Sequence, residues 1–149
     1  MKKFHFPLDR VLDWRRTQGR LEEAKLEQLY REAHDLEARQ QALLQERADS
    51  EQAVLAAPST TGLQLAALGE FSRFTTAQHA LLERQRAECA KLVAAQVQVL
   101  TAKRREIRLL ERLREQRLDG WSADLDREIG AQADEAFLAK WAGKSAGLQ

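Results

Sequence analysis

Basic side chains gather in one run of this 149-residue chain, between residues 103 and 117. The run comprises Lys103, Arg104, Arg105, Arg108, Arg112, Arg114 and Arg117. Such a concentration of positive charge would suit an acidic ring or groove on a partner molecule. The alternative interpretation is a solvated flank of a helix. Binding to nucleic acid is disfavoured, because no aromatic residues are interleaved with the arginines.

Groups that could act as nucleophiles, general acids or metal ligands are scattered. His5, His34 and His79 are far apart, and the chain has no H-E-x-x-H motif, no C-x-x-C motif and no glycine-rich phosphate loop. The single cysteine, Cys89, cannot form an intrachain disulfide and fits a reducing compartment. We therefore expect no catalytic residues, no metal site and no cofactor, and we interpret Cys89 as a small packing residue.

The composition is typical of long helices. Ala, Glu, Lys, Leu and Arg together make up roughly 58% of the chain, above the level of about 50% that indicates coiled coils. There are only two prolines, and the charged residues, 32% of the chain, nearly cancel to a net charge of +1. Overall charge therefore predicts neither a nucleic-acid partner nor a membrane surface.

The periodicity predicts an all-α chain with two long helices, at residues 8–56 and 67–142, joined by a turn at residues 57–66. The first helix carries apolar residues at alternating three- and four-residue steps, namely Leu26, Leu29, Ala33, Leu36, Gln40 and Leu43. Between them, Ala57–Gly62 holds the clustered turn residues. An earlier start of the second helix is left open, with Thr60 or Thr61 as N-cap.

The second helix is expected to pack through a matching line of residues, namely Phe71, Phe74, Leu81, Leu82, Leu92, Ala95, Val99, Leu109, Leu110 and Leu113. Two such helices joined by a short turn must run antiparallel. The expected fold is one long antiparallel two-helix coiled-coil hairpin spanning residues 1–149.

The second helix is expected to outlast the first. If the turn centres near residues 57–66, Leu8 lies opposite residues 111–119, and Gly120 to Trp141 form an unpaired overhang of roughly 30–35 Å on a shaft of roughly 75 Å. The overhang nevertheless carries an apolar stripe of Leu118, Trp121, Leu125, Ile129, Ala133, Phe137 and Trp141. We interpret it as a docking helix for a partner protein. The alternatives are a fold-back onto Trp14 and the first helix, or homodimerisation.

Two more features are expected from this pairing. The basic run should lie beside Arg10, Arg15, Arg16 and Arg20 of the first helix, so that positive charge concentrates at the open end. Near the turn, Phe71, Phe74 and Leu81 form either the last core layer or an exposed recognition patch. No apolar run approaches the roughly 18 residues needed to span a bilayer, and no signal peptide is apparent, so a cytoplasmic location is expected.

Three short motifs resemble the FliJ family of flagellar type III export proteins. The opening Phe4-His5-Phe6-Pro7-Leu8-Asp9-Arg10-Val11-Leu12 is similar to that family's F-x-F-x-L-x-x-V-L start. Phe71-x-x-Phe74 resembles the aromatic start of its second helix, and Gln132 to Phe137 resembles its Asp-Glu-containing end. One departure is Gln78, where a large apolar residue would extend the patch near the turn.

The resemblance implies a non-catalytic, stalk-like coiled coil that binds the hexameric export ATPase, the export-gate membrane protein and escort chaperones of late substrates. Its place would be the cytoplasmic side of the inner membrane, peripheral to it, at the flagellar base. Alternatives are the equivalent stalk of a virulence secretion system, a generic dimerising spacer and a nucleic-acid-binding helical arm. Weak homodimerisation is left open.

On this interpretation we assign two sets of binding residues. The export-gate set is Phe71, Phe74 and Leu81. The ATPase set combines the basic open end with the overhang, and comprises Arg15, Arg16, Arg20, Arg104, Arg105, Arg108, Arg112, Trp121, Leu125, Ile129, Asp134, Glu135, Phe137 and Trp141.

Overall fold

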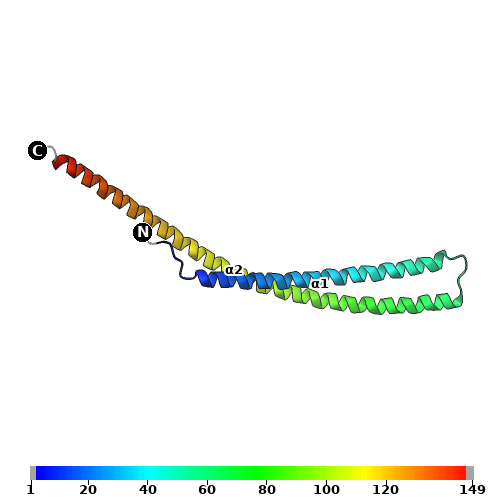
Figure 1. Ribbon diagram of the computed structural model, residues 1–149. Helices are drawn as coiled ribbons and strands as arrows, with labels where there is room; N and C mark the ends of the chain where they lie inside the picture. The colour runs from blue at the N-terminus through cyan, green and yellow to red at the C-terminus, as the bar shows by residue number, and fades with distance from the viewer. Residues whose placement is uncertain (1–2, 147–149) are drawn as a thin grey trace. The chain divides into compact units, whose positions relative to one another are not determined.

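Two long helices account for the regular structure of the described residues. The computed structural model describes residues 3–146, and the side chains of residues 3–144. Helix α1 spans Asp9–Ala56 and helix α2 spans Gly62–Ala146, and the two pack together (Figure 1). No strand occurs among the described residues. The expected all-helical class is confirmed, and within the described residues no helix is both long and apolar enough to cross a membrane.

Helix α2 begins five residues earlier than residue 67, because a reciprocal cap forms at Thr61. The Thr61 hydroxyl oxygen accepts a hydrogen bond from the backbone N–H of Gln64 at 3.2 Å. The Gln64 side-chain oxygen in turn accepts one from the backbone N–H of Thr61 at 2.9 Å. This capping box satisfies two N–H groups that would otherwise lack partners at a helix start. The connection therefore shrinks to residues 57–61, and Thr61 is the N-cap that the sequence left open.

The chain divides into two parts, which we describe separately: residues 18–102, and residues 1–17 with 103–149. Within residues 18–102, residues later in α1 contact residues earlier in α2. The Gln96 amide bonds to the backbone oxygen of Glu22 at 3.1 Å, and the Cys89 thiol to that of Leu29 at 3.5 Å. Nearer the connection, Arg47 donates to Thr76 at 3.3 Å.

We call the line of residues along which α1 and α2 contact each other the seam, and its α1 side follows the expected line. Gln40 is buried. The apolar residues that precede and follow it at steps of three and four are half-buried, namely Leu26, Leu29, Ala33, Leu36 and Leu43. The line continues to Arg47, Ser50 and Val54, all half-buried. Its alternating steps keep one face of α1 against α2.

The α2 side follows the expectation at some positions and differs from it by one residue at others. Cys89 is buried as expected, and half-buried residues of the expected line are Phe71, Leu82, Leu110 and Leu113. The buried side chains are Thr75, Cys89 and Leu100, at 2%, 5% and 4% exposure. Phe74, Leu81, Leu92 and Val99, expected in the seam, are between 42% and 56% exposed. A shift of one residue turns a helix by about 100°, so these four residues lie on a neighbouring face.

Hydrogen bonding explains why this more polar line is tolerated in the seam. Gln40 lies 2.9 Å from the His79 ring nitrogen Nε2, and Arg86 donates to the Gln40 side-chain oxygen. Buried polar groups cost little when each finds a partner. Apolarity alone therefore selected the wrong residue at four positions of α2.

Candidate interaction site

The N-terminal segment packs against the later half of α2 in the part formed by residues 1–17 and 103–149. Leu12 and Phe6 are almost fully buried, at 1% and 2% exposure. The backbone N–H of Asp9 bonds to the Phe6 oxygen at 3.1 Å, which holds Phe6 beside the first turn of α1. The F-x-F-x-L opening thus supplies the apolar anchor of this part.

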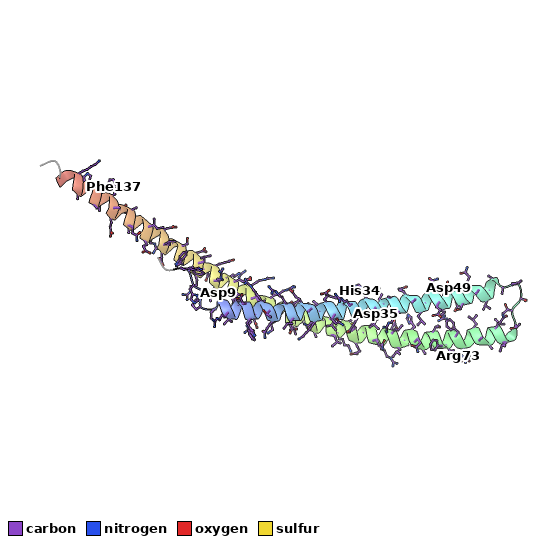
Figure 2. The ribbon with its side chains drawn as sticks, in the orientation of Figure 1. Asp9, His34, Asp35, Asp49, Arg73 and Phe137 are labelled. Carbon is purple, nitrogen blue, oxygen red and sulfur yellow. The ribbon has the colours of Figure 1, made fainter. Side chains whose placement is uncertain are left out.

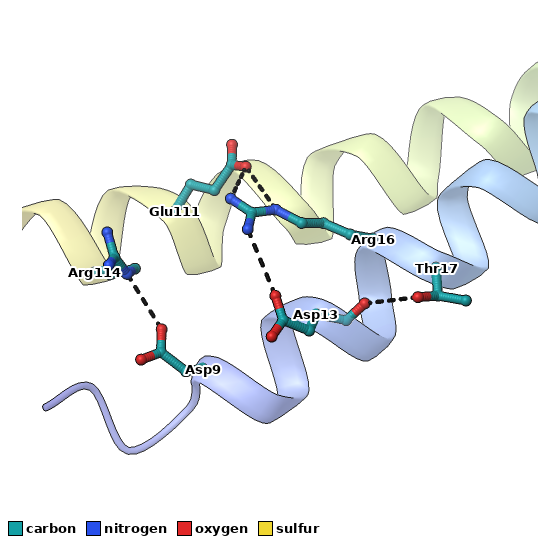
Figure 3. Close-up of polar contacts among 6 residues, drawn as sticks. All are labelled: Asp9, Asp13, Arg16, Thr17, Glu111 and Arg114. Atoms are coloured by element: carbon teal, nitrogen blue, oxygen red, sulfur yellow. Dashed lines mark hydrogen bonds and ion pairs between the residues drawn. The ribbon is translucent and has the colours of Figure 1, made fainter.

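Three arginines of this part are held by carboxylates across the two segments. Arg15 pairs with Glu106 at 2.6 Å, Arg16 with Glu111 at 2.8 Å, and Arg114 with Asp9 at 3.2 Å. Figure 3 shows the last two, with Asp13 as a second partner of Arg16 at 3.7 Å. Such pairs fix the position of the N-terminal segment, and they leave Arg15 and Arg16 less available to a partner than the sequence suggested.

A second set of contacts covers Trp121. The Phe4 and Trp121 rings lie 5.9 Å apart between centroids, tilted by 56°. The Arg114 guanidinium carbon lies 5.8 Å from the centre of the Phe4 ring. Tilted ring pairs and cations near ring faces are both favourable contacts. The expectation that everything from Gly120 onward lacks a partner in its own chain is therefore wrong at Trp121, because the two residues before Phe6 reach further along α2 than a helix starting at Leu8 would.

Among the arginines of this part that have no ion-pair partner within the described residues, three lie along one face of α2. Arg105, Arg108 and Arg112 follow each other at steps of three and four residues, and with Leu109 they line a shallow depression. All three are exposed, and none forms an ion pair with another described residue. Leu109 is 66% exposed between them. We call these four residues the arginine row.

The remaining predicted arginines do not join this row. Arg104 is exposed but already has an interaction of its own. Arg20 is exposed and belongs to the other part of the chain. The predicted concentration of positive charge therefore consists of arginines that already have a partner among the described residues and arginines, including those of the row, that do not.

Beyond the N-terminal segment, α2 is uncovered. Leu118 and Leu125 are half-buried, whereas every residue from Asp126 to Lys144 is exposed. We call this the C-terminal stretch; its large apolar side chains are Ile129 at 49%, Phe137 at 68%, Leu138 at 61% and Trp141 at 66% exposure. Asp134 and Glu135 are also exposed, and Figure 2 marks Phe137.

The residues assigned to the export gate lie in residues 18–102. Phe74 and Leu81 are 56% and 46% exposed, and Phe71 is half-buried. Because Thr75 occupies the seam at this level, Phe74 is not part of a core layer. An apolar patch is therefore open on α2 here.

Sequence reasoning missed two features. It placed both Leu109 and Leu110 in the seam, whereas Leu110 is half-buried and Leu109 is 66% exposed. It placed Gln40 in the packing line of the first helix but did not foresee the hydrogen bonds of Gln40 with His79 and Arg86. The seven-residue step from His79 to Arg86 and the three-residue step to Cys89 were the available indication.

The described residues hold no group of three or more His, Cys, Asp or Glu side chains that could bind a metal ion. Comparisons of the chain with protein families, with characterised proteins and with solved structures give no match.

Proposed function

We propose that the protein is a non-catalytic component of flagellar type III export, an antiparallel two-helix coiled coil that acts as a stalk. In this role it binds the hexameric export ATPase and promotes its assembly and activity. It also links the ATPase to the export gate and to escort chaperones, at the cytoplasmic side of the inner membrane. The resemblance of three motifs to the FliJ family supports this proposal, and the exposed side chains of the arginine row and of the patch near the connection support its binding surfaces.

The arginine row is the observation that carries this proposal. A guanidinium that already has an intrachain carboxylate loses that pair when it binds a partner, whereas Arg105, Arg108 and Arg112 lose only water. Arginine is suited to pairing with carboxylates, because its planar donors match their geometry. Leu109 adds an apolar contact at the centre of the row, where burial contributes most.

The motifs of the resemblance also have positions that fit the stalk role. The opening motif anchors the N-terminal segment through Phe6 and covers Trp121 through Phe4. The row lies on α2 in this same part of the chain. Phe74 and Leu81 offer a separate apolar patch, which we assign to the export gate.

Stimulation of the cognate export ATPase tests the proposal. The triple variant Arg105→Gln, Arg108→Gln, Arg112→Gln should lose most of the stimulation, because each partner carboxylate would lose its cation. A matched control replaces three exposed arginines of residues 18–102, Arg31, Arg39 and Arg73, by Gln and should stimulate normally. Equal stimulation by both triple variants would show that the row does not bind the ATPase.

Salt dependence separates this function from a helical arm that binds nucleic acid. If the row served nucleic acid, the wild-type chain would bind RNA or DNA with an affinity that falls steeply as salt rises. The export proposal expects no such binding and retains ATPase stimulation.

A further inference from the structure

We infer that the C-terminal stretch is a self-association surface, which pairs antiparallel with the same stretch of a second copy of this chain. The inference concerns residues 126–144, where it gives Phe137 and Trp141 to a second copy in place of the ATPase contact expected from the sequence, and it does not depend on the identity of the ATPase. Large apolar side chains are exposed along this stretch, and exposed apolar surface of this kind usually marks a binding surface. The sequence of the stretch indicates what binds there.

One face of the stretch carries two of its four large apolar side chains and a charged residue near each end. At about 100° per residue, Asp126, Gly130, Ala133, Phe137, Trp141 and Lys144 fall within about 80° of the helix circumference, whereas Ile129 and Leu138 lie outside it. All six are exposed. The face is about 27 Å long from the first residue to the last.

The two ends of this face are complementary in charge and in size. The end nearer Asp126 is acidic and small, with Gly130 and Ala133. The other end is basic and bulky, with Phe137, Trp141 and Lys144. A second copy running in the opposite direction places each feature against its complement: Asp126 faces Lys144, Gly130 faces Trp141, and Ala133 faces Phe137.

A parallel pair would do the reverse, since it would bring Asp126 against Asp126 and Trp141 against Trp141. Like charges facing each other are destabilising, and two bulky rings at one level hold the helices apart. The charge pattern therefore selects the antiparallel arrangement. An isologous pair of this kind repeats each contact twice about its two-fold axis.

Gly130 fits the same arrangement. A glycine within a helix costs about 1 kcal/mol relative to alanine, and nothing lies within 4 Å of where its Cβ would be, as is also true of Gly120 and Gly143. Of these three glycines, only Gly130 lies on this face. In the antiparallel pair, that position receives the Trp141 ring of the second copy.

Sedimentation equilibrium of the full chain tests the inference. We expect a reversible monomer–dimer equilibrium, and replacing both Phe137 and Trp141 by Ala should weaken the dimer at least tenfold. A wild-type chain that stays monomeric at all concentrations would overturn the inference. So would a dimer that both alanines leave unchanged, because it would then form through another surface.

Charge exchange tests the direction of pairing. Asp126→Lys alone and Lys144→Asp alone should each weaken the dimer about tenfold, because like charges would then face each other twice. The double variant should dimerise as the wild type does, since each bridge is restored with its polarity reversed. A double variant as weak as the singles would contradict the antiparallel arrangement.

Gly130→Leu gives a test in which folding cannot be the cause of failure. The leucine should raise the melting temperature of the monomer, because glycine is the poorer helix former, and yet weaken the dimer at least tenfold by filling the space for Trp141. Gly120→Leu is the matched control: its Cβ also meets nothing within 4 Å, but it lies outside residues 126–144 and about 100° round the helix from the centre of this face, and it should leave dimerisation unchanged. Equal dimerisation by both variants would overturn the inference.

Discussion

The two parts of the chain differ in how their polar and charged side chains bond to other side chains of the same part. In residues 18–102 the seam is polar, and its polar groups bond to one another, as Gln40 does with His79 and Arg86. In residues 1–17 and 103–149 the anchor is apolar, with Phe6 and Leu12 buried, and open arginines lie beside paired ones. The comparison indicates that the seam of the first part is held by bonds among its own polar groups, whereas the second part leaves the arginine row open.

The largest expected effect comes from removing the apolar anchor. Phe6→Ala should destabilise the attachment of the N-terminal segment by about 3 kcal/mol, because large-to-small changes at buried aromatic sites cost that much. Hydrogen exchange should then rise in residues 4–17. Phe74→Ala, the same chemical change at a ring that is 56% exposed, should cost less than about 1 kcal/mol. Similar losses for both would mean that Phe6 is no anchor.

The polar seam should respond more weakly to a single change. Gln40→Ala removes the partner of both Arg86 and His79. Because Arg86 is exposed and His79 half-buried, water can replace the amide, and the loss should be about 1 kcal/mol, the net contribution of a typical hydrogen bond. Urea unfolding would measure this loss of free energy of unfolding. The adjacent Gln41 is exposed, so Gln41→Ala is the control and should be nearly neutral. A seam that tolerates both changes equally would not depend on this bonded group.

Replacing a glycine in residues 18–102 should raise the stability of the protein instead of lowering it. Gly69 lies inside α2, and nothing is within 4 Å of its Cβ position. Gly69→Ala should therefore raise the free energy of unfolding by up to about 1 kcal/mol, seen as a higher melting temperature. Destabilisation instead would reveal a need for glycine at this position.

The smallest effects concern the ion pairs, and they compare the two parts directly. The Arg15–Glu106 pair, with side chains 32% and 44% exposed, should show a coupling of up to about 1 kcal/mol in a double-mutant cycle. The local Glu27–Arg31 pair, 65% and 71% exposed, should give no more than about 0.5 kcal/mol. A stronger coupling for the local pair would contradict the role of Arg15 in holding the segment.

The sequence predicted the helical class, the first helix and its packing line, because a regular apolar repeat on α1 has one interpretation. On α2 it was right at Cys89, which is buried, and at Leu82 and Leu110, which are half-buried, but wrong at four apolar positions on a neighbouring face. The line through Phe74, Leu81, Leu92 and Val99 is more apolar, but the line through Thr75, Cys89 and Leu100 is buried. Hydrogen bonds across the seam decide between them, and single-sequence periodicity does not register such bonds.

The sequence predicted where the arginines of the candidate site lie, but not which of them are paired with carboxylates. Charge clustering located the arginines, yet it could not tell Arg15 and Arg16, which have carboxylate partners, from Arg105 and Arg108, which do not. That distinction depends on Glu106 and Glu111, whose partners come from the other helix. Likewise, the reach of Phe4 to Trp121 depends on an extended segment that carries no periodic pattern.

Photo-crosslinking from the arginine row tests the central claim most directly. A photoreactive residue in place of Leu109 should crosslink to the export ATPase, because Leu109 lies among the three open arginines and is 66% exposed. The same residue in place of Leu44, which is 44% exposed in the other part, should give little product. Crosslinking from position 44 but not from position 109 would contradict the assignment of the row as the ATPase-binding surface.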